Sequence, residues 1–322
     1  MVSRRLVRIK IIKALYSHFN CGDKTISASE KDLLLSIEKT YDLYHYLMQL
    51  LVEVADYAQN RIDIGKQKYR PSPEEKNPNT KFVDNAIVSI LRNNEALNKR
   101  LHQNKLSWKD NPELIKRIYN NLISKDYYKS YMDAANRSFK QDQEFALEFF
   151  AEEMEDFEDL YEILEANNIF WVDDVEFVLG MILRTIKRFK EGQHTYASLL
   201  PLYKDEADYE FTKKLFRKAA VNHVEYRKLI DENTANWDID RIAYMDTILL
   251  ITAIAELIEF RDLPIKVSMN EYIELSKFYS TPSSNTFING VLDKVVKELS
   301  DKNIIVKEGL GLLDSQSNVS ED

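Results

Sequence analysis

The chain is poor in the two residues that most often interrupt helices, with 7 glycines and 7 prolines among 322 residues. Each makes up about 2% of the chain, where roughly 7% glycine and 5% proline are usual. β-Sandwiches, β-barrels and Rossmann-type folds need these residues at many turns. Their scarcity argues against those folds and favours long helices joined by few breaks. We therefore predict an all-α protein.

The bulk composition fits one large or two ordinary domains. Hydrophobic residues make up 44% and aromatic residues 11%, which is ample for a buried core. Cys21 is the single cysteine, so we expect no internal disulfide, no cysteine-based zinc site and a reducing, cytoplasmic setting. The best apolar run, 248–258, is shorter than a membrane span, so we expect no membrane association.

Charge is distributed unevenly along the chain. The net charge of −9 argues against a wholly basic nucleic-acid binder. Residues 1–20 nevertheless carry five basic side chains and no acid, whereas residues 141–176 carry fourteen acids and no Lys or Arg. The acidic segment has two interpretations. It is either a solvated helix face over an aromatic core stripe, or a surface that binds a basic partner or shields an RNA site.

Hydrophobic spacing predicts where the helices lie. In residues 4–19 apolar side chains recur every three or four positions, which is typical of an amphipathic helix. The proline-rich residues 69–80 predict the clearest loop, and Ser268 with Glu271 has the form of a capping box. The other helices are predicted at about 30–61, 81–103, 111–139, 143–166, 172–190, 208–231, 238–260, 268–278 and 284–299.

Patterns that carry common enzyme chemistry are missing from the sequence. There is no glycine-rich phosphate-binding loop, the histidines lack the spacing of a helical metal site, and no carboxylate pair stands out. Cys21 near His18 has the residue types of a nucleophile and its base, but an unrelated thiol and imidazole explain the pair more simply. We expect no catalytic residues, no metal site, no cofactor and no enzyme activity.

Four separated segments carry a specific combination of motifs. They are SRRLVRIKIIKALYSHF (3–19), NWDIDRIAYMDTILLITAIAEL (236–257), LPIKVSMNEYIELSKFYS (263–280) and FINGVLDKVVKEL (287–299). In this order they resemble the transcription antitermination factor NusB family. The resemblance implies two small helical bundles, no catalysis, and pairing with NusE, a small-subunit ribosomal protein. It also implies that the pair binds the single-stranded boxA element of nascent ribosomal RNA, which loads an antitermination complex onto RNA polymerase.

The resemblance also divides the chain into segments. Residues 1–20 would be the first helix of a NusB-like fold, 21–164 a helical insertion or extra subdomain, 165–306 the NusB-like core and 307–322 a frayed polar tail. The predicted fold class is therefore all-α, with two helical bundles of NusB-like type and an additional helical insertion.

The resemblance places RNA contacts on the first helix and on the last-helix motif. Arg4, Arg5 and Arg8 would contact phosphates, a salt-sensitive contribution without sequence readout. Tyr16 and Phe287 align with family rings, and single-stranded RNA is commonly held by bases stacked on aromatic side chains. Without the resemblance, the arginines would be a solvated face and both rings core residues.

Asp246 and Ser283 are the candidate partner-binding residues that the resemblance implies. Asp246 stands at the family position that meets the ribosomal-protein partner, where a carboxylate can accept charge-assisted hydrogen bonds. Taken alone, it would be a solvent-exposed helix acid. Ser283 stands where some members carry an acid, a difference that would change the affinity for the partner.

Two alternatives to an RNA-binding antitermination factor stay open. One is a helical interaction scaffold that kept the fold and lost RNA binding. The other is the RNA-binding part of an rRNA-modifying system, which is disfavoured because no glycine-rich cofactor loop follows the motifs. A titration with boxA-type RNA separates the scaffold from the RNA-binding factor.

Overall fold

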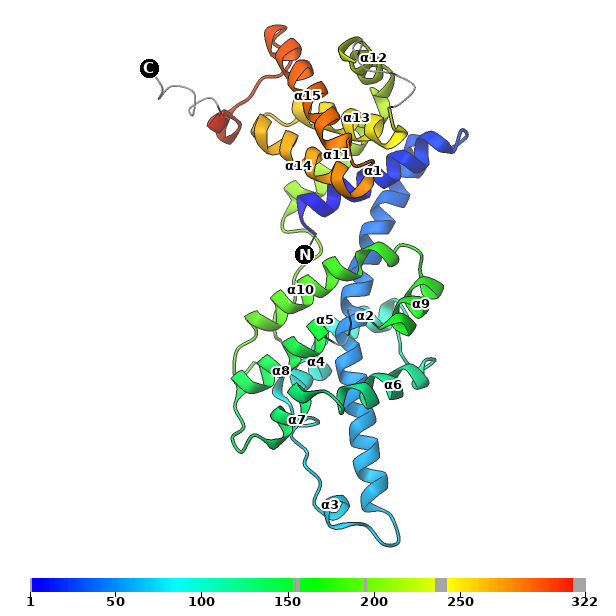
Figure 1. The fold of residues 1–322 in the computed structure, drawn as a ribbon, viewed down its shortest axis with the longest axis vertical. Helices are drawn as coiled ribbons and strands as arrows, with labels where there is room; N and C mark the ends of the chain where they lie inside the picture. Colours follow the sequence, from blue (N-terminus) through cyan, green and yellow to red (C-terminus); the bar gives the residue numbers. More distant parts are fainter. Residues whose placement is uncertain (1, 153, 155–156, 194–195, 235–241, 315–322) are drawn as a thin grey trace. The chain divides into compact units, whose positions relative to one another are not determined.

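The computed structural model describes the whole chain except residues 1, 153, 155–156, 194–195, 235–241 and 315–322. The described residues form fifteen α-helices and no strand (Figure 1), which confirms the predicted all-α class. None of these helices combines the length and hydrophobicity that crossing a membrane requires. The chain divides into two compact units: unit 1 holds Glu38–Leu202, and unit 2 holds Val2–Ile37 with Tyr203–Asp322.

Unit 2 is built around one central helix. Helix α13 (Tyr244–Glu259) packs against five neighbours of the same unit. From Asp246 to Leu257 every residue of α13 is buried, as expected for a helix that is apolar nearly all round. The neighbours are α1 (Arg4–Asn20), α11 (Glu206–Val221), α12 (His223–Asn233), α14 (Ile265–Tyr279) and α15 (Ser284–Asp301). A 3-10 helix, η3 (Gly309–Asp314), contacts α14.

Unit 1 contains the larger part of the long helix α2 (Ile26–Lys66), from Glu38 onward, and a set of shorter helices. Its best-packed aromatic pair is Tyr46 and Trp108, whose rings stack with centroids 3.8 Å apart. Trp108 is 1% exposed and its Nε1 donates to the Tyr46 carbonyl at 2.9 Å. The shorter helices are α3 (Pro73–Lys76), α4 (Ala86–Asn93), α5 (Glu95–Gln103), α6 (Pro112–Leu122), α7 (Asp126–Asp133), α8 (Phe139–Glu152), α9 (Glu158–Asn167), η1 (Val172–Asp174) and α10 (Val175–Arg188).

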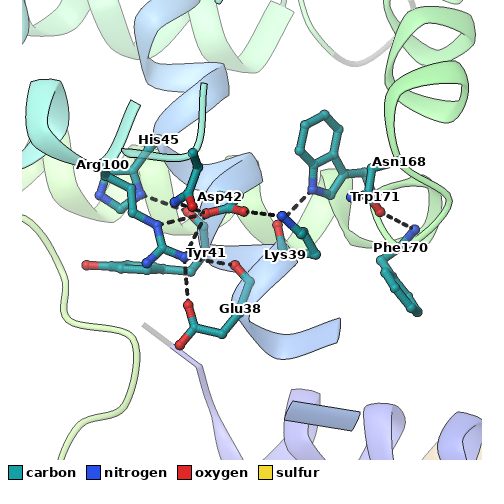
Figure 2. A network of polar contacts seen from close by, with 10 residues as sticks. Glu38, Lys39, Tyr41, Asp42, His45, Arg100, Asn168, Phe170 and Trp171 are labelled. Carbon is teal, nitrogen blue, oxygen red and sulfur yellow. Dashed lines mark hydrogen bonds and ion pairs between the residues drawn. The ribbon is translucent and has the colours of Figure 1, made fainter. Parts of the chain in front are cut away.

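A polar network attaches α5 to α2 within unit 1 (Figure 2). The buried Asp42 carboxylate accepts hydrogen bonds from Lys39 Nζ at 2.9 Å and from Arg100 Nε at 2.8 Å. Arg100 Nη2 also donates to Glu38 Oε2 at 2.6 Å, so its guanidinium is bound to two carboxylates. One turn further along α2, the His45 Nδ1 is 2.7 Å from the Tyr41 carbonyl oxygen. Burial is the main reason that the pKa of His45 falls to about 4.

The compact units begin and end at other residues than the predicted domains. Residues 21–37 belong to unit 2, although the prediction placed them in the insertion, and residues 165–202 belong to unit 1, although the prediction placed them in the core. The assignment of a NusB-like core and an insertion stays a prediction. Of the predicted tail, 307–322, residues 315–322 lie outside the described part.

The structure has more helix breaks than the sequence predicted. The single helix expected at 81–103 is α4 and α5, divided at Asn94, whose side chain accepts from the Leu97 amide at 3.0 Å and caps α5. The helix expected at 111–139 is α6 and α7, separated where Ser124 Oγ donates to the Asn121 carbonyl at 2.6 Å. The acidic helix expected at 143–166 is α8 and α9.

The predicted capping box at Ser268 and Glu271 is wrong. Helix α14 begins at Ile265, directly after Pro264, so Ser268 lies inside the helix and not at its start. The fixed φ of proline suits a helix start, which explains why the helix begins earlier than the Ser-x-x-Glu pattern predicted. Ser268 is fully buried and its Oγ donates to Glu256 Oε1 at 2.7 Å.

Candidate nucleic-acid interface

Helix α1 carries the basic residues that the sequence analysis selected. Its start is fixed by Ser3, whose side chain accepts from the Leu6 amide at 3.2 Å. The three arginines that follow have different surroundings. Arg5 is exposed. Arg4 is partly exposed and its Nε donates to Asp208 Oδ1 on α11 at 3.1 Å. Arg8 is buried.

The Arg8 guanidinium forms a two-point ion pair with Glu256 of α13. Arg8 Nε and Nη2 lie 2.7 Å from Glu256 Oε2 and Oε1, respectively. Glu256 is 0% exposed and also accepts from Ser268 Oγ at 2.7 Å and from Tyr272 OH at 2.9 Å, both on α14. The carboxylate therefore has four donors. This buried cluster, Arg8, Glu256, Ser268 and Tyr272, joins α1, α13 and α14.

Within the buried cluster Arg8 stays charged and Tyr272 stays protonated. Burial opposes the charge of Arg8, but the hydrogen bonds and charge of Glu256 raise the pKa of Arg8 above its ordinary value. Burial, followed by the neighbouring Glu256 carboxylate, raises the pKa of Tyr272, so Tyr272 stays a hydrogen-bond donor. The Arg8 guanidinium also lies over the Phe211 ring, 5.6 Å from its centroid, and Arg4 lies over the same ring at 4.9 Å.

The two candidate RNA-stacking rings have opposite exposure. Tyr16 is 44% exposed and meets Tyr244 of α13 edge to face, with ring centroids 5.6 Å apart. Phe287, in the first turn of α15, is 7% exposed. Tyr16 therefore offers an accessible ring surface in this structure, whereas Phe287 has the burial of a core residue.

The candidate partner-binding residues lie close to one another. Asp246, near the start of α13, accepts a 2.8 Å hydrogen bond from Ser284 Oγ, and Ser284 directly follows the exposed Ser283. Asp246 is 3% exposed, so it is not a solvent-exposed helix acid. Its second oxygen, Oδ1, is buried and has no hydrogen-bond partner among the residues that the structure describes. Asp246 therefore helps to hold the turn before α15.

The residues that hold α1 in place were not among the predicted site residues. Glu256 carried a usable signal, because an acid within an apolar helical run is rarely buried without a partner. Tyr272 and Phe211 carried no comparable signal, since buried rings are common in any helical core. Tyr244 became relevant only through its contact with Tyr16.

The acidic segment combines a core stripe with acids of different roles. Phe145, Phe149 and Leu164 are buried, as the stripe predicted. Glu144 and Glu148 are exposed, which fits a solvated face. Two other acids accept hydrogen bonds inside unit 1: Asp142 from Tyr131 OH at 2.6 Å, and Asp174 from Thr40 Oγ1 at 2.5 Å. Residues 153, 155 and 156 of the segment lie outside the described part.

Across the described ranges, no three His, Cys, Asp or Glu side chains gather in a way that could hold a metal ion. Cys21, which the sequence favoured as an unrelated thiol rather than a nucleophile, is exposed. His18 Nδ1 lies 2.9 Å from Ser29 Oγ.

The sequence matches known proteins over part of its length. The NusB family is matched by residues 181–297. The Salinibacter ruber transcription antitermination protein NusB is 41% identical over 114 residues, which are 35% of this chain and 71% of that protein. The protein of the same name from Chloroherpeton thalassium is 38% identical over 105 residues, which are 33% of this chain and 50% of that protein. The one from Methylacidiphilum infernorum is 36% identical over 98 residues, which are 30% of this chain and 68% of that protein.

A comparison with solved structures finds NusB of T. maritima, with 27% identity over 43% of this chain and 86% of that chain, and a TM-score of 0.28. The family range begins after α1, so the N-terminal motif at 3–19 lies outside it. Residues 236–241, the beginning of the second motif, lie outside the described part of the structure.

Proposed function

This chain belongs to the NusB family, and from that premise we propose that it is an RNA-binding transcription antitermination factor. In this proposal it pairs with a NusE-type small-subunit ribosomal protein, and the pair binds boxA-like single-stranded RNA during ribosomal RNA transcription. The pair then acts in an antitermination complex with RNA polymerase. The protein works in the cytoplasm, by binding and not by catalysis.

The observation that carries the RNA-binding proposal, beside family membership, is the exposed side of α1. Arg5 and Tyr16 are both exposed on this helix, and Arg4 is partly exposed. Arg5 and Tyr16 are about 16 Å apart along the helix, so Arg5 would hold a phosphate and Tyr16 a base of different nucleotides of one single strand. In the proposal Arg8 acts indirectly, because its ion pair with Glu256 fixes the helix that presents the other two residues.

The partner surface is proposed at the start of α15. Ser283 is exposed there, and Asp246 orders the adjacent turn by accepting from Ser284. A basic partner would approach Ser283 and benefit from the buried carboxylate behind it. The family resemblance also predicts direct contacts of Asp246, Phe287 and Arg8 with partner or RNA. All three side chains are buried in this structure, so the proposal does not depend on these contacts, which stay predictions.

The RNA-binding proposal predicts a loss of affinity when Arg5 or Tyr16 is changed. Arg5→Gln is expected to reduce the slope of log affinity against log salt by about 0.7, the contribution of one phosphate contact on a single strand. Tyr16→Ala is expected to weaken binding roughly tenfold, the effect of one lost base stack. Fluorescence anisotropy with a boxA-like RNA, in the presence of the NusE-type protein and across salt concentrations, measures both effects.

The exposed Lys297 of α15 provides the control, because Lys297→Gln removes one positive charge from the same unit away from α1. This variant should bind RNA as the unchanged protein does. If the unchanged protein binds the NusE-type protein but no RNA, alone or paired, the interaction-scaffold alternative replaces the proposal.

The partner proposal predicts slower association when a positive charge is placed at Ser283. Ser283→Arg would repel a basic ribosomal protein and is expected to lower the association rate several-fold, with a smaller effect on dissociation. Asn289→Arg, at another exposed position of α15, is the matched control. Biolayer interferometry with immobilised NusE-type protein gives both rates. Equal rates for the two variants would remove Ser283 from the partner surface.

A further inference from the structure

A groove of about 520 Å³ opens between α1, α12 and α13 of unit 2. Its walls include Phe19 from α1, Val224 and Arg227 from α12, and Tyr244 from α13. Val224 is 69% exposed and Tyr244 is 39% exposed, so the apolar part of the groove is open to solvent. Apolar side chains that are exposed together in one groove indicate a binding site, whereas exposed apolar side chains scattered over a surface are normal.

Aromatic rings line one side of this groove and continue onto the α1 surface. Phe19 packs against His223, the first residue of α12, with ring centroids 4.8 Å apart. Tyr244 lies in the groove wall and also meets the exposed Tyr16 at 5.6 Å. The groove is therefore continuous with the ring that the proposed function assigns to RNA.

The cations of the groove are less neutralised than those of the neighbouring helix. In the described part of the chain no carboxylate lies within ion-pair distance of Arg227, and Lys228 has only a 3.8 Å contact with Glu232 on its own helix. Among the described residues that line the groove, Asp231 is the one acid. The α11 cations Lys214 and Lys218 both pair with Glu259, by contrast, and Arg217 pairs with Glu30.

We propose that this groove is a second RNA subsite, which binds one or more bases of the single strand beyond the nucleotide at Tyr16. The inference rests on the proposed function and extends it to α12 and α13. Partly exposed rings beside Arg227, for which the described residues supply no acidic partner, favour a polyanion with stacking bases over an apolar protein segment. Arg227 would hold a phosphate while Tyr244 and Phe19 contact bases.

The test compares two RNAs, a minimal boxA-like oligomer and the same oligomer extended by six nucleotides at either end. The full chain with the NusE-type protein is titrated with each RNA. Arg227→Gln is expected to weaken binding of one extended RNA roughly fivefold or more, while binding of the minimal RNA changes less than twofold. Tyr244→Leu should weaken binding of both RNAs, and of the extended one more, because its ring also meets Tyr16. Arg227 is exposed, so its variant should fold normally even if Tyr244→Leu does not. Lys297→Gln is the charge-matched control.

Photocrosslinking adds a readout that identifies the contact directly. An extended RNA with 5-iodouridine outside the minimal oligomer should crosslink to Tyr244 or Phe19. If the minimal RNA binds but extension adds no affinity and no crosslink, the groove subsite is wrong while the proposed function stands. If the groove variants lose affinity for the NusE-type protein instead of the RNA, the groove is a protein site and the inference is overturned. If neither RNA binds, the proposed function fails and the inference with it.

Discussion

Replacing Arg8 with methionine is expected to lower the free energy of unfolding by about 3–5 kcal/mol. The reason is the Glu256 carboxylate, which is 0% exposed and would lose both hydrogen bonds from the guanidinium. Ser268 and Tyr272 would still donate to it, but two neutral donors do not balance a buried charge. Urea unfolding followed by far-UV circular dichroism measures the loss, and hydrogen exchange of the α1 amides locates it.

Two further variants isolate the buried charge as the cause. Arg8→Met combined with Glu256→Leu removes both charges of the two-point ion pair and should be more stable than Arg8→Met alone, because the fully buried Glu256 carboxylate is gone. In both variants Glu271, which lies 3.6 Å from Arg8 Nη1, loses its cation equally. Arg4, like Arg8, lies on α1, and Arg4→Met breaks its partly exposed ion pair with Asp208 of α11, which should cost about 1 kcal/mol or less. A single Arg8→Met variant as stable as the unchanged protein would refute the structural role given to this arginine.

The Arg8 experiment also determines how RNA affinity should be interpreted. If Arg8 acts by fixing α1, its variant should lose RNA affinity only as far as it loses folded structure, and the slope against salt should stay unchanged. A direct phosphate contact would instead lower that slope by about 0.7 in the folded protein. The prediction that Arg8 touches RNA is therefore testable separately from the same prediction for Arg5.

The three arginines of α1 show which features of the structure could be predicted from the sequence alone and which could not. Low glycine and proline content and regular hydrophobic spacing were enough for the all-α class, because both are local consequences of helix geometry. The same spacing placed Arg4, Arg5 and Arg8 on one helix but could not distinguish them. That distinction depends on Glu256, which is 248 residues away from Arg8 along the chain. The residues next to an arginine in the sequence do not predict which residue of a distant helix will contact it in the folded protein.

The helix breaks show a second limit of the same kind. Large apolar residues end at Leu91 and resume at Leu97, a gap too short to predict a break, yet the Asn94 side chain caps α5 and also donates to the Ala197 carbonyl at 2.8 Å. Asparagine is compatible with both a helix interior and a cap, and the distant carbonyl favours the cap. Asp246 is similar, because its burial follows from packing between α13 and the turn before α15 and not from its own neighbours in sequence.

Unit 1 is expected to lose stability between pH 6.5 and pH 4 because of His45. Burial, aided by the nearby Arg100 charge, lowers the pKa of His45 to about 4, although the Tyr41 carbonyl and Asp42 oppose this shift. The ordinary value in an unfolded chain is 6.5. Within this window the unfolded chain binds more protons than the folded one, so stability falls as the pH falls. The loss should reach about 2 kcal/mol at pH 5 and about 3 kcal/mol at pH 4.

Urea unfolding at pH 7 and pH 5, followed by tryptophan fluorescence, measures this loss in unit 1, where Trp108 and Trp171 are buried. His45→Phe keeps an aromatic ring but cannot be protonated, so the part of the pH dependence due to His45 should disappear. Since other groups also titrate below pH 7, the relevant quantity is the difference between this variant and the unchanged chain. His102→Phe, at an exposed position of α5, should keep the full dependence. If His45→Phe responds to pH as the unchanged protein does, His45 is not buried in its neutral form, and the network of Figure 2 does not determine the acid sensitivity of this unit.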